Sequence, residues 1–432
     1  MPQSALHSNM WRILGLPIKL LILDEVQKAK NVELGRGKRS SAIRALFFRS
    51  CIQVSGTFMH NQWSDILANL LLVKGHPFTS TLLFNKMFVE NTYNNRFQSL
   101  TPDRILIMQK LLLAFVVARP GSVLDLPGII VWKHDFNLGT YDSRLVTLLV
   151  KKFEKIVRCQ KMGIFDDGGD NALNTLVKAQ LRSLHPCLYT PTPEEQELLY
   201  VLGGVGDELF GEKLEEQMNE IEDVSRDKAS GAAIDGDDPD DPDYDPDADK
   251  SDIDEEAGIY EEVSKTEDKD REAWLKRIAD KNFELVSSRM LAFLLVYDTF
   301  RKAFPDEKIM VFSPYLKVLD LFAEVLIQKR KVESLRYDGT MGNEAREGVR
   351  IEFARSNPSI PILITAAAGG VGLNITTASC IIQDGPWWNH NNEKQAYCRG
   401  HRLGQTRVVK VVWLNASNSE VRHNPIIEVL NK

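Results

Sequence analysis

Short continuous apolar runs alternate along this chain with longer segments in which apolar residues recur at helical spacing. In the N-terminal part, a Leu/Ile-rich run at residues 20–23 is closed by Asp24 and Glu25, and a second run follows at residues 51–54. Runs this short that are apolar throughout are typical of strands buried on both faces of a parallel sheet. We predict a helix between the two runs at residues 40–49, and an α/β unit for this part as a whole.

The C-terminal part shows the same alternation over a greater length. We predict a helix at residues 273–304, followed by strands at residues 308–312, 360–365, 380–383 and 408–414. Strands that alternate with helical segments imply a parallel sheet covered on both faces, so the fold class of the chain is α/β.

Between these parts, apolar positions at helical spacing run from residue 141 to about residue 224 and predict a helical subdomain. The pattern therefore divides the chain into a first α/β lobe at residues 1–126, a helical connector at 127–224, an acidic insertion at 225–270 and a second α/β lobe at 271–432.

The acidic insertion changes how the overall charge is interpreted. Residues 235–256 hold thirteen Asp or Glu and one Lys, so a local charge of -12 within a total of -7 leaves about +5 on the rest of the chain. The remainder is therefore compatible with nucleic acid as a ligand. High like charge, Pro and few large apolar residues predict disorder for this segment, as a solvated insertion or as an arm that attracts histones or another basic partner.

The amino-acid composition further narrows the class of protein. The chain has 432 residues and 43% hydrophobic content, which is enough for two or three folded units. No apolar run approaches the roughly 20 residues of a membrane span, and the N-terminal residues lack the pattern of a signal peptide, so we expect an intracellular protein without a membrane partner. The five cysteines form neither a Cys-x-x-Cys pair nor a zinc spacing, which favours buried reduced thiols.

Two adjacent carboxylates stand where the first predicted strand ends. In open α/β sheets ligands bind at the carboxyl ends of strands, which is where Asp24 and Glu25 fall. One carboxylate suits Mg²⁺, usually through water, and the other suits the orientation or deprotonation of an attacking water. The alternative is helix capping, which such a pair often performs.

Two arginines near the C-terminal end suit phosphate recognition. Arg399 and Arg402 are three residues apart and are predicted to share one face of a helix. Guanidinium groups match phosphate oxygens and could neutralise charge that develops in phosphoryl transfer. A solvated basic helix face is the alternative.

A glycine-rich segment follows the strand at residues 360–365. Gly369, Gly370 and Gly372 would let the backbone approach a phosphate closely. The aromatic sequence Pro-Trp-Trp-Asn follows at residues 386–389, and we favour core packing for Trp387 and Trp388.

Taken in order, these segments resemble the Swi/Snf-type ATPases of helicase superfamily two. DEVQKAKN resembles the Walker B box, VSGTFMHN the Ser/Thr-Gly-Thr motif, and LLLAFVVARPGSVLDLPG the segment that leaves the first lobe. In the second lobe the resemblance continues through VFSPYLKVLDLF, RYDGTM, AAAGGVGLN, GPWWN and QAYCRGHRLGQ, in the order of the family.

The resemblance implies two RecA-like lobes that hydrolyse ATP with Mg²⁺ and move along double-stranded DNA in chromatin remodelling or repair. It implies that Asp24 (with Mg²⁺), Glu25, Arg399 and Arg402 are catalytic, and that Gln27, Gly370, Gly372 and Gln395 bind nucleotide. It implies that nucleotide state is coupled to DNA by Ser55, Gly56, Thr57, Thr365, Gly369 and Asn374, for whose hydroxyls strand-end capping is the alternative. Nucleosomes or histones as partners and a nuclear location are likewise expectations from the family.

One family feature is not found in these 432 residues. The sequence GRGKRS at residues 35–40 follows the Walker B box and has Arg39 where Ser or Thr should meet Mg²⁺, so it is not the Gly-Lys-Thr phosphate loop. We therefore expect an N-terminally truncated motor whose ATP turnover is weak or absent. The alternatives are a non-catalytic platform for DNA or chromatin and a degenerate gene product. Gly400, where Ala would favour a helix by about 1 kcal/mol, fits such relaxed positions.

Overall fold

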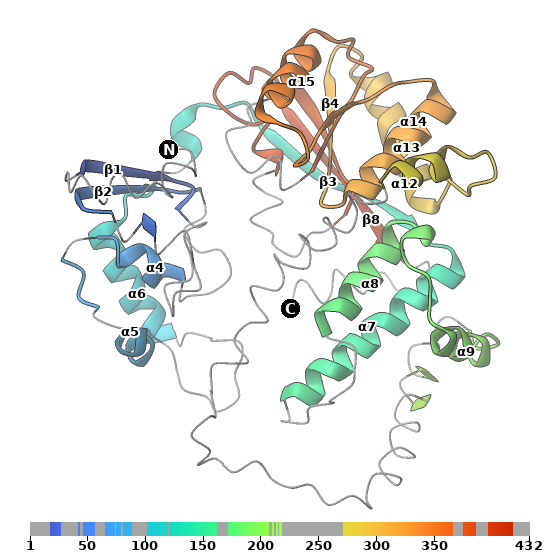
Figure 1. The fold of residues 1–432 in the computed structure, drawn as a ribbon, viewed down its shortest axis with the longest axis horizontal. Coiled ribbons are helices and arrows are strands. Elements are labelled where there is room, and N and C mark those ends of the chain that lie inside the picture. Colours follow the sequence, from blue (N-terminus) through green and yellow to red (C-terminus); the bar gives the residue numbers. More distant parts are fainter. Residues whose placement is uncertain are drawn as a thin grey trace, which may run out of the picture. The chain divides into compact units, whose positions relative to one another are not determined.

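The computed structural model divides the chain into two compact units, Met1–Asp125 and Leu126–Lys432 (Figure 1). The structure describes residues 18–26, 42–43, 46–56, 65–73, 75–78, 81–88, 102–119, 121–161, 172–206, 210, 213–214, 216–217, 271–365, 375–385 and 396–417. Each unit is treated separately below.

The first unit contains a two-stranded parallel sheet. Strand β1 (Ile18–Asp24) pairs with β2 (Phe48–Val54) along their whole lengths, and the register runs from Ile18 opposite Phe48 to Asp24 opposite Val54. One face packs on a small core formed by Ile43 and Leu72. The other face carries apolar side chains that stay 46 to 60% exposed, namely Leu20, Ile22, Ile52 and Val54.

Helices make a separate core in this unit. They are α4 (Asp65–Leu70), α5 (Thr81–Phe88), α6 (Pro102–Phe115) and the short 3₁₀ helix η2 (Gly121–Leu124). Phe78, Phe84 and Phe88 meet with ring centroids 4.9 to 5.9 Å apart and pack with Ile66 and Met108. The buried residues of this core come from α4, α5, α6 and the segment just before α5.

The prediction of a helix at residues 40–49 was wrong at its C-terminal end. Ala42 and Ile43 are helical, but Phe48 and Arg49 already belong to β2. The reason is that Phe48 packs with the small core under the sheet, and this tertiary contact outweighs local helix propensity.

The second unit contains a six-stranded parallel sheet in the order β3-β8-β7-β4-β6-β5. Its strands are β3 (Ile129–Asn137), β4 (Lys308–Ser313), β5 (Leu335–Tyr337), β6 (Ile362–Thr365), β7 (Ala378–Gln383) and β8 (Val409–Ser417). The four strands predicted in the C-terminal part are all present, and the predicted α/β class is confirmed. The prediction missed β3 and β5.

Strand β3 corrects the prediction of a helical connector from residue 127 onward. Its nine residues pair with β8 from Ile129 opposite Val409 to Asn137 opposite Ser417. The sequence IIVWKHDFN is rich in β-branched and aromatic residues, as strands are, but its exposed positions break the simple alternation. Only the later part of the connector is helical.

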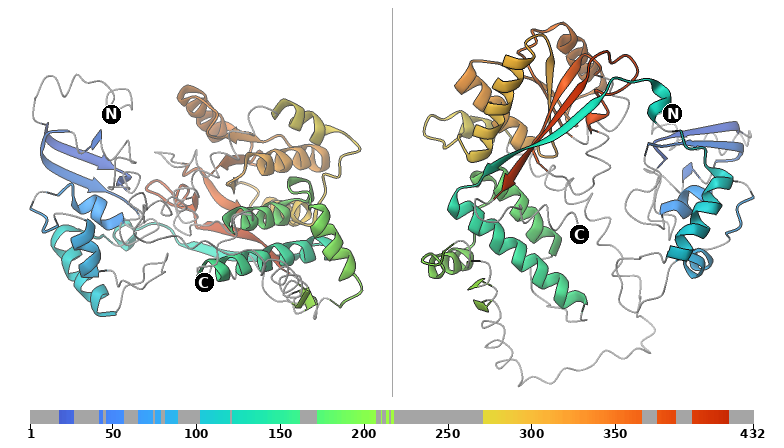
Figure 2. Two further views of the ribbon diagram at one scale, coloured as in Figure 1. Left: turned by 60° about the horizontal axis from the view of Figure 1, so that its bottom comes forward. Right: turned by 180° about the vertical axis from the view of Figure 1, so that it is seen from behind.

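Helices cover both faces of this sheet (Figures 1 and 2). On one face, α13 (Ser288–Ala303) and α14 (Leu316–Arg330) pack on alternate strand residues such as Ile309, Val311 and Ile382. On the other face, Phe353 of α15 (Asn343–Arg355) packs with Met310 and Phe312. The alternation follows from the two-residue period of a strand.

The helix predicted at residues 273–304 is two helices, α12 (Arg271–Ala279) and α13. Asp280 Oδ1 accepts the backbone N–H of Asn282, and Ser287 caps α13 by accepting the N–H of Met290. Short polar side chains that bond the backbone in this way end one helix and begin the next.

The helical part of the connector consists of α7 (Thr140–Lys161), α8 (Ala172–Leu184), η3 (Pro186–Leu188) and α9 (Pro193–Val201). Leu145, Leu149, Leu176 and Leu199 belong to its core. Thr192 and Glu195 form a capping box at the start of α9. Within the described ranges, no helix is both long and apolar enough to cross a membrane.

Candidate functional site

The carboxyl ends of the central strands bring three polar side chains together in the second unit. Ser313 ends β4, Thr365 ends the neighbouring β6, and Asp384 follows β7 on the other side. Ser313 lies opposite Thr365 in the register, and its hydroxyl donates to Asp384 Oδ2. The chain crosses β4 when it passes from β6 to β7, so this is a switch point of the kind where open α/β sheets bind ligands.

Thr365 differs from its neighbours at this edge. Its side chain is 4% exposed, and its Oγ1 has no hydrogen-bond partner among the residues that the structure describes. A buried hydroxyl without a partner is unfavourable by about 1 to 3 kcal/mol. Among the described residues the hydroxyl makes no capping bond, and strand-end capping stays the alternative to a ligand-coupling role.

Arg289 supports this edge of the sheet through hydrogen bonds to backbone carbonyls, and its role was not predicted from the sequence. It is fully buried on α13, and its guanidinium donates to the backbone carbonyls of Ser183, Asp384 and Leu414. Burial lowers the pKa of Arg289 to about 10, while the charge of Asp384 opposes this. A Cβ at Gly385 would lie 3.2 Å from Arg289 Nη1, which explains a glycine directly after Asp384.

The two predicted arginines lie on a turn and not on one face of a helix. In the described segment at residues 396–405, only Ala396 and Tyr397 are helical. Arg399 is 2% exposed, whereas Arg402 is partly exposed and its Nε donates to the Cys398 carbonyl at 3.2 Å. The prediction that the two arginines share one helix face was therefore wrong, because the chain turns after Tyr397. We call residues 396–405 the arginine turn.

Gln405 organises the arginine turn and was assigned no role from the sequence. Its Nε2 donates to the carbonyls of Ala378 and Gly400 at 2.9 Å each, and its Oε1 accepts the N–H groups of Thr406 and Arg407 at 3.0 Å each. This single amide uses its full hydrogen-bonding capacity to join the turn to the start of β7. A Gly-Gln pair just before a strand was the available signal in the sequence.

Gly400 has a packing role that corrects its interpretation as a relaxed position. A Cβ at this residue would lie 2.8 Å from Met310 Cε and 3.3 Å from the Ala378 carbonyl oxygen. The turn therefore packs closely on β4 and β7, and a side chain at this position would require Met310 and the turn to shift.

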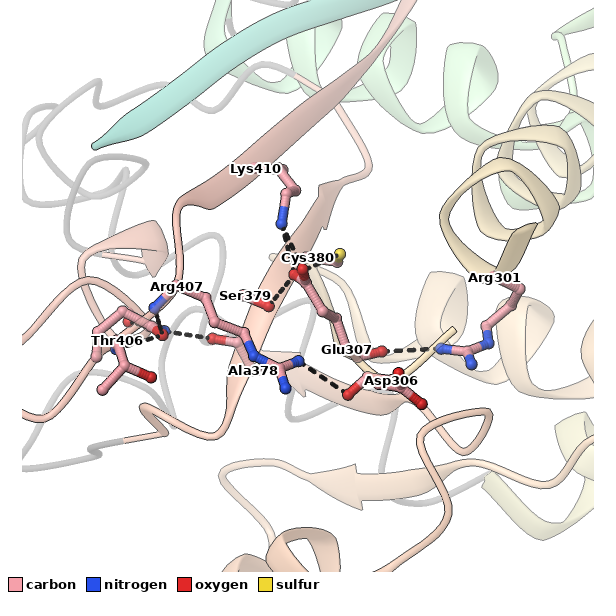
Figure 3. Close-up of polar contacts among 11 residues, drawn as sticks. Arg301, Asp306, Glu307, Ala378, Ser379, Cys380, Thr406, Arg407 and Lys410 are labelled. Carbon is pink, nitrogen blue, oxygen red and sulfur yellow. Dashed lines mark hydrogen bonds and ion pairs between the residues drawn. The ribbon is translucent and has the colours of Figure 1, made fainter. Parts of the chain in front are cut away.

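The amino-terminal end of the same sheet carries a closed ion pair (Figure 3). Lys410 Nζ lies 2.7 and 2.6 Å from the two carboxylate oxygens of Glu307, and Ser379 Oγ donates to the same carboxylate. Burial alone would raise the pKa of Glu307, but the hydrogen bonds from Lys410 and Ser379 outweigh it and lower that pKa. Burial, and then Glu307, raise the pKa of the adjacent Cys380 to about 12. All partners in this cluster are satisfied, so it fits a structural role.

In the first unit, the sheet brings the ends of β1 and β2 together. Because Asp24 lies opposite Val54, Asp24 and Glu25 reach the same edge as Ser55 and Gly56. Asp24 Oδ1 accepts the N–H of Glu25 at 2.9 Å, and Glu25 has a positive φ of 52°. Asp24 thus caps its own strand end in this structure. In the described part of the chain, no three His, Cys, Asp or Glu side chains could hold a metal ion together.

Several predicted positions lie outside the described residues. They are Gln27, Thr57, Gly369, Gly370, Gly372, Asn374, Gln395, the aromatic sequence at 386–389 and the acidic insertion at 225–270. Asp24 and Glu25 belong to the first unit and Arg399 and Arg402 to the second, so the structure defines no geometry between the two pairs.

Comparisons with known proteins agree with this arrangement. Residues 291–404, from α13 to the arginine turn, match the helicase conserved C-terminal domain. The DNA repair protein RAD5B of Arabidopsis thaliana is 40% identical over 125 residues, which cover 29% of this chain and 10% of that protein. The DNA repair protein RAD5 of Yarrowia lipolytica is 34% identical over 158 residues, which cover 37% of this chain and 15% of that protein. The DNA repair protein rad8 of Schizosaccharomyces pombe is 42% identical over 106 residues, which cover 24% of this chain and 9% of that protein.

Two solved structures are also similar in part. The C-terminal part of the Fun30 ATPase domain has a TM-score of 0.41 at 17% identity and covers 69% of this chain and 91% of its own. The Sulfolobus solfataricus SWI2/SNF2 ATPase core in complex with dsDNA has a TM-score of 0.38 at 16% identity, with coverages of 96% and 66%. The chain spans only about a tenth of the length of the first curated relatives.

Residues 291–404 are therefore a helicase C-terminal domain, which contributes strands β4, β5, β6 and β7 to the parallel sheet. The relatives that bear names are DNA repair proteins of the RAD5 and rad8 type, and the chain is similar to each of them over about a quarter to a third of its own length.

Proposed function

We propose that this chain provides the second, DNA-engaging lobe of a Swi/Snf-type DNA-dependent ATPase. The observation that carries the proposal is the match over residues 291–404, which includes Thr365, Arg399 and Arg402 in one continuous domain. Thr365 fits a contact with the DNA backbone, because its buried hydroxyl has no partner among the described residues. Arg402 fits a contact with nucleotide phosphate, because its side chain is partly exposed.

The residues present fit Mg²⁺ and ATP only in part. Mg²⁺ is usually held by one or two carboxylates together with water and phosphate oxygens, so Asp24 and Glu25 would suffice when nucleotide supplies the rest. Bound Mg²⁺ would supply positive charge to neutralise the phosphates, and Glu25 would orient water. Because these 432 residues contain no Gly-Lys-Thr phosphate loop, we propose that the chain by itself turns over ATP weakly or not at all.

Duplex DNA is the proposed partner, and the nucleus is the proposed location. The support comes from relatives named DNA repair proteins and from a similar ATPase core solved with dsDNA. A role in chromatin remodelling, with nucleosomes or histones as partners, is the finer form of this proposal.

The test of DNA engagement is binding of the full chain to a labelled duplex of about 30 base pairs without ATP, at several salt concentrations. We expect binding that weakens as salt rises, because phosphate contacts release counterions. Thr365→Val replaces the hydroxyl with a methyl group of similar size and should weaken binding by roughly 3- to 10-fold. Thr299→Val is the matched control, since its hydroxyl bonds the Leu295 carbonyl on the exposed side of α13. Absence of binding at low salt would refute the proposal.

The test of ATP turnover compares the full chain with Arg402→Ala, with and without duplex DNA. We expect both to stay at background. DNA-stimulated hydrolysis that the substitution abolishes would overturn the proposed inactivity while supporting the role of Arg402. Arg330→Ala is the control, because Arg330 pairs with Asp298 on an exposed surface.

A non-catalytic DNA-binding platform is the second candidate, favoured by the missing phosphate loop. It predicts salt-dependent DNA binding that neither ATP nor Arg402→Ala changes. An effect of ATP on DNA affinity would exclude it.

A further inference from the structure

Residues 126–128, which we call the entering segment, lead the chain into the second unit and are held there by hydrogen bonds. After η2, Asp125 adopts a positive φ of 43°, and residues 126–128 lead directly into β3. The N–H of Val409 donates to the Gly128 carbonyl at 3.0 Å, one step before the nine-residue ladder between β3 and β8 begins. This entering segment is thus joined to the last described strand of the sheet.

A second bond joins the entering segment to the arginine turn. His401 Nε2 lies 2.6 Å from the Pro127 carbonyl oxygen. Because a carbonyl oxygen only accepts, Nε2 must carry the proton of this hydrogen bond. His401 stands between Arg399 and Arg402, so the contact reaches the residues proposed to meet phosphate.

The arginine turn is braced internally. The N–H groups of Arg399, Gly400 and Gln405 donate to the carbonyls of Ala396, Tyr397 and Arg402 at 2.9 to 3.1 Å. Gln405 adds the bonds to Ala378 and Gly400 described above. A displacement of His401 is therefore shared by the turn and not absorbed at one side chain.

We propose that His401 is a positioning residue that couples the entering segment to the arginine turn, so that a displacement of residues 126–128 moves Arg402. The functional consequence rests on the proposed phosphate role of Arg402. The coupling itself is a property of the second unit, and by linkage it acts in both directions.

The experiment measures amide hydrogen exchange in the full chain without DNA or nucleotide. Pro127→Gly keeps the carbonyl but loosens the backbone of the entering segment. In the otherwise unchanged chain, it should accelerate exchange at residues 399–405 by roughly 3- to 10-fold, the range of one lost hydrogen bond. In a His401→Ala background, the same substitution should add less than about twofold, because coupled sites are not additive.

Two further variants separate coupling from simple support of the turn. His401→Gln keeps an N–H donor in place of Nε2 and should restore the response to Pro127→Gly. His134→Ala, on β3, is the matched control and should leave that response unchanged. An equal response to Pro127→Gly in the unchanged and His401→Ala chains would overturn the proposal, as would no response in either.

The two proposals can fail separately, because DNA binding is measured on the same samples in a different assay. Loss of DNA binding with intact coupling would remove the proposed function alone. Intact DNA binding with additive exchange effects would remove the coupling alone.

Discussion

The two parallel sheets of this chain use strands of similar composition in different surroundings. In β1, with the sequence IKLLILD, every residue is exposed or only partly buried, and Ile22 is 60% exposed. In β4 and β7, with the sequences KIMVFS and ASCIIQ, every residue is buried. An apolar run therefore predicts a strand, while the helices packed on it decide whether the strand is covered.

The difference extends from packing to chemistry. The carboxyl edge of the six-stranded sheet is held by Arg289 and by the Ser313–Asp384 bond. The corresponding edge of the two-stranded sheet holds Asp24 by a bond to its own neighbour, Glu25. A covered sheet can fix its polar residues from several elements, and this is what a preorganised site requires.

The largest expected effect is the difference in local stability between the sheets. We expect the amides of β4 and β7 to exchange only on global unfolding of the second unit, and those of β1 and β2 to exchange through local opening. The gap should be on the order of 4 kcal/mol, or about a thousandfold in rate. Hydrogen exchange with mass spectrometry measures both in one sample. Equal protection of the two sheets would contradict the comparison.

The second largest expected effect concerns the ion pair at the amino-terminal end of the six-stranded sheet. The side chains of Glu307 and Lys410 are 14% and 10% exposed, so removal of one partner leaves the other charge poorly solvated. Glu307→Gln should lower the free energy of unfolding of the second unit by about 3 kcal/mol. The double variant Glu307→Leu with Lys410→Met should recover most of this in urea unfolding. No recovery would mean that Ser379 and the packing matter more than the charge.

Gly400→Ala should destabilise the second unit by roughly 1 to 2 kcal/mol, because its Cβ would overpack a closed core at Met310. Helix propensity alone gives the opposite sign, a gain of about 1 kcal/mol. Gly348→Ala on α15 is the control, since a Cβ there meets nothing within 4 Å. A more stable Gly400→Ala protein would restore the interpretation of this glycine as a relaxed position.

The fold was predictable where local pattern and tertiary packing agree. The runs at 308–312 and 380–383 predicted strands because complete burial requires apolar residues at every position. Strand β3 was missed because it is an edge strand with exposed Ile130, Val131 and Trp132, and its partner β8 lies about 280 residues away. Nothing local to β3 identifies that partner.

The candidate site was predictable in its residue types but not in its geometry. Thr365 and Asp24 stand at strand ends, as the sequence implied. Arg399 is buried whereas Arg402 is partly exposed, and His401 forms a hydrogen bond with the Pro127 carbonyl. Both features depend on contacts between segments that are distant in the sequence. Arg289 gave no signal, because an arginine within an apolar helix does not show which carbonyls it will meet.

A smaller effect concerns pH and His185, which joins α8 to the segment before α13. It is 2% exposed, its Nδ1 accepts the N–H of Cys187, and its Nε2 lies 3.1 Å from the Leu285 carbonyl. Burial lowers the pKa of His185, although the Leu285 bond and the charges of Asp142 and Glu284 oppose it.

Because the folded pKa of His185 lies below the unfolded one, the stabilisation is complete above about pH 6.5 and is lost as the pH falls. Between about pH 7.5 and 5.5, the free energy of unfolding should fall by roughly 1 kcal/mol. His185→Gln should remove this part of the dependence in urea unfolding, and His134→Gln should keep it. An unchanged slope in His185→Gln would exclude His185 as its source.

The smallest effect returns to the uncovered sheet. Ile22→Thr keeps a β-branched residue in β1 and should change the free energy of unfolding of the first unit by less than about 0.5 kcal/mol, because Ile22 is 60% exposed. The matched substitution Ile382→Thr, at a fully buried position of β7, should lower that of the second unit by about 2 kcal/mol, since it removes apolar contact and buries a hydroxyl. Urea unfolding followed by hydrogen exchange assigns each change to its unit. If Ile22→Thr lowered the free energy of unfolding as much as Ile382→Thr, the exposed face of β1 and β2 would be covered in solution. The contrast between the sheets would then reflect an absent binding partner and not a difference in their own packing.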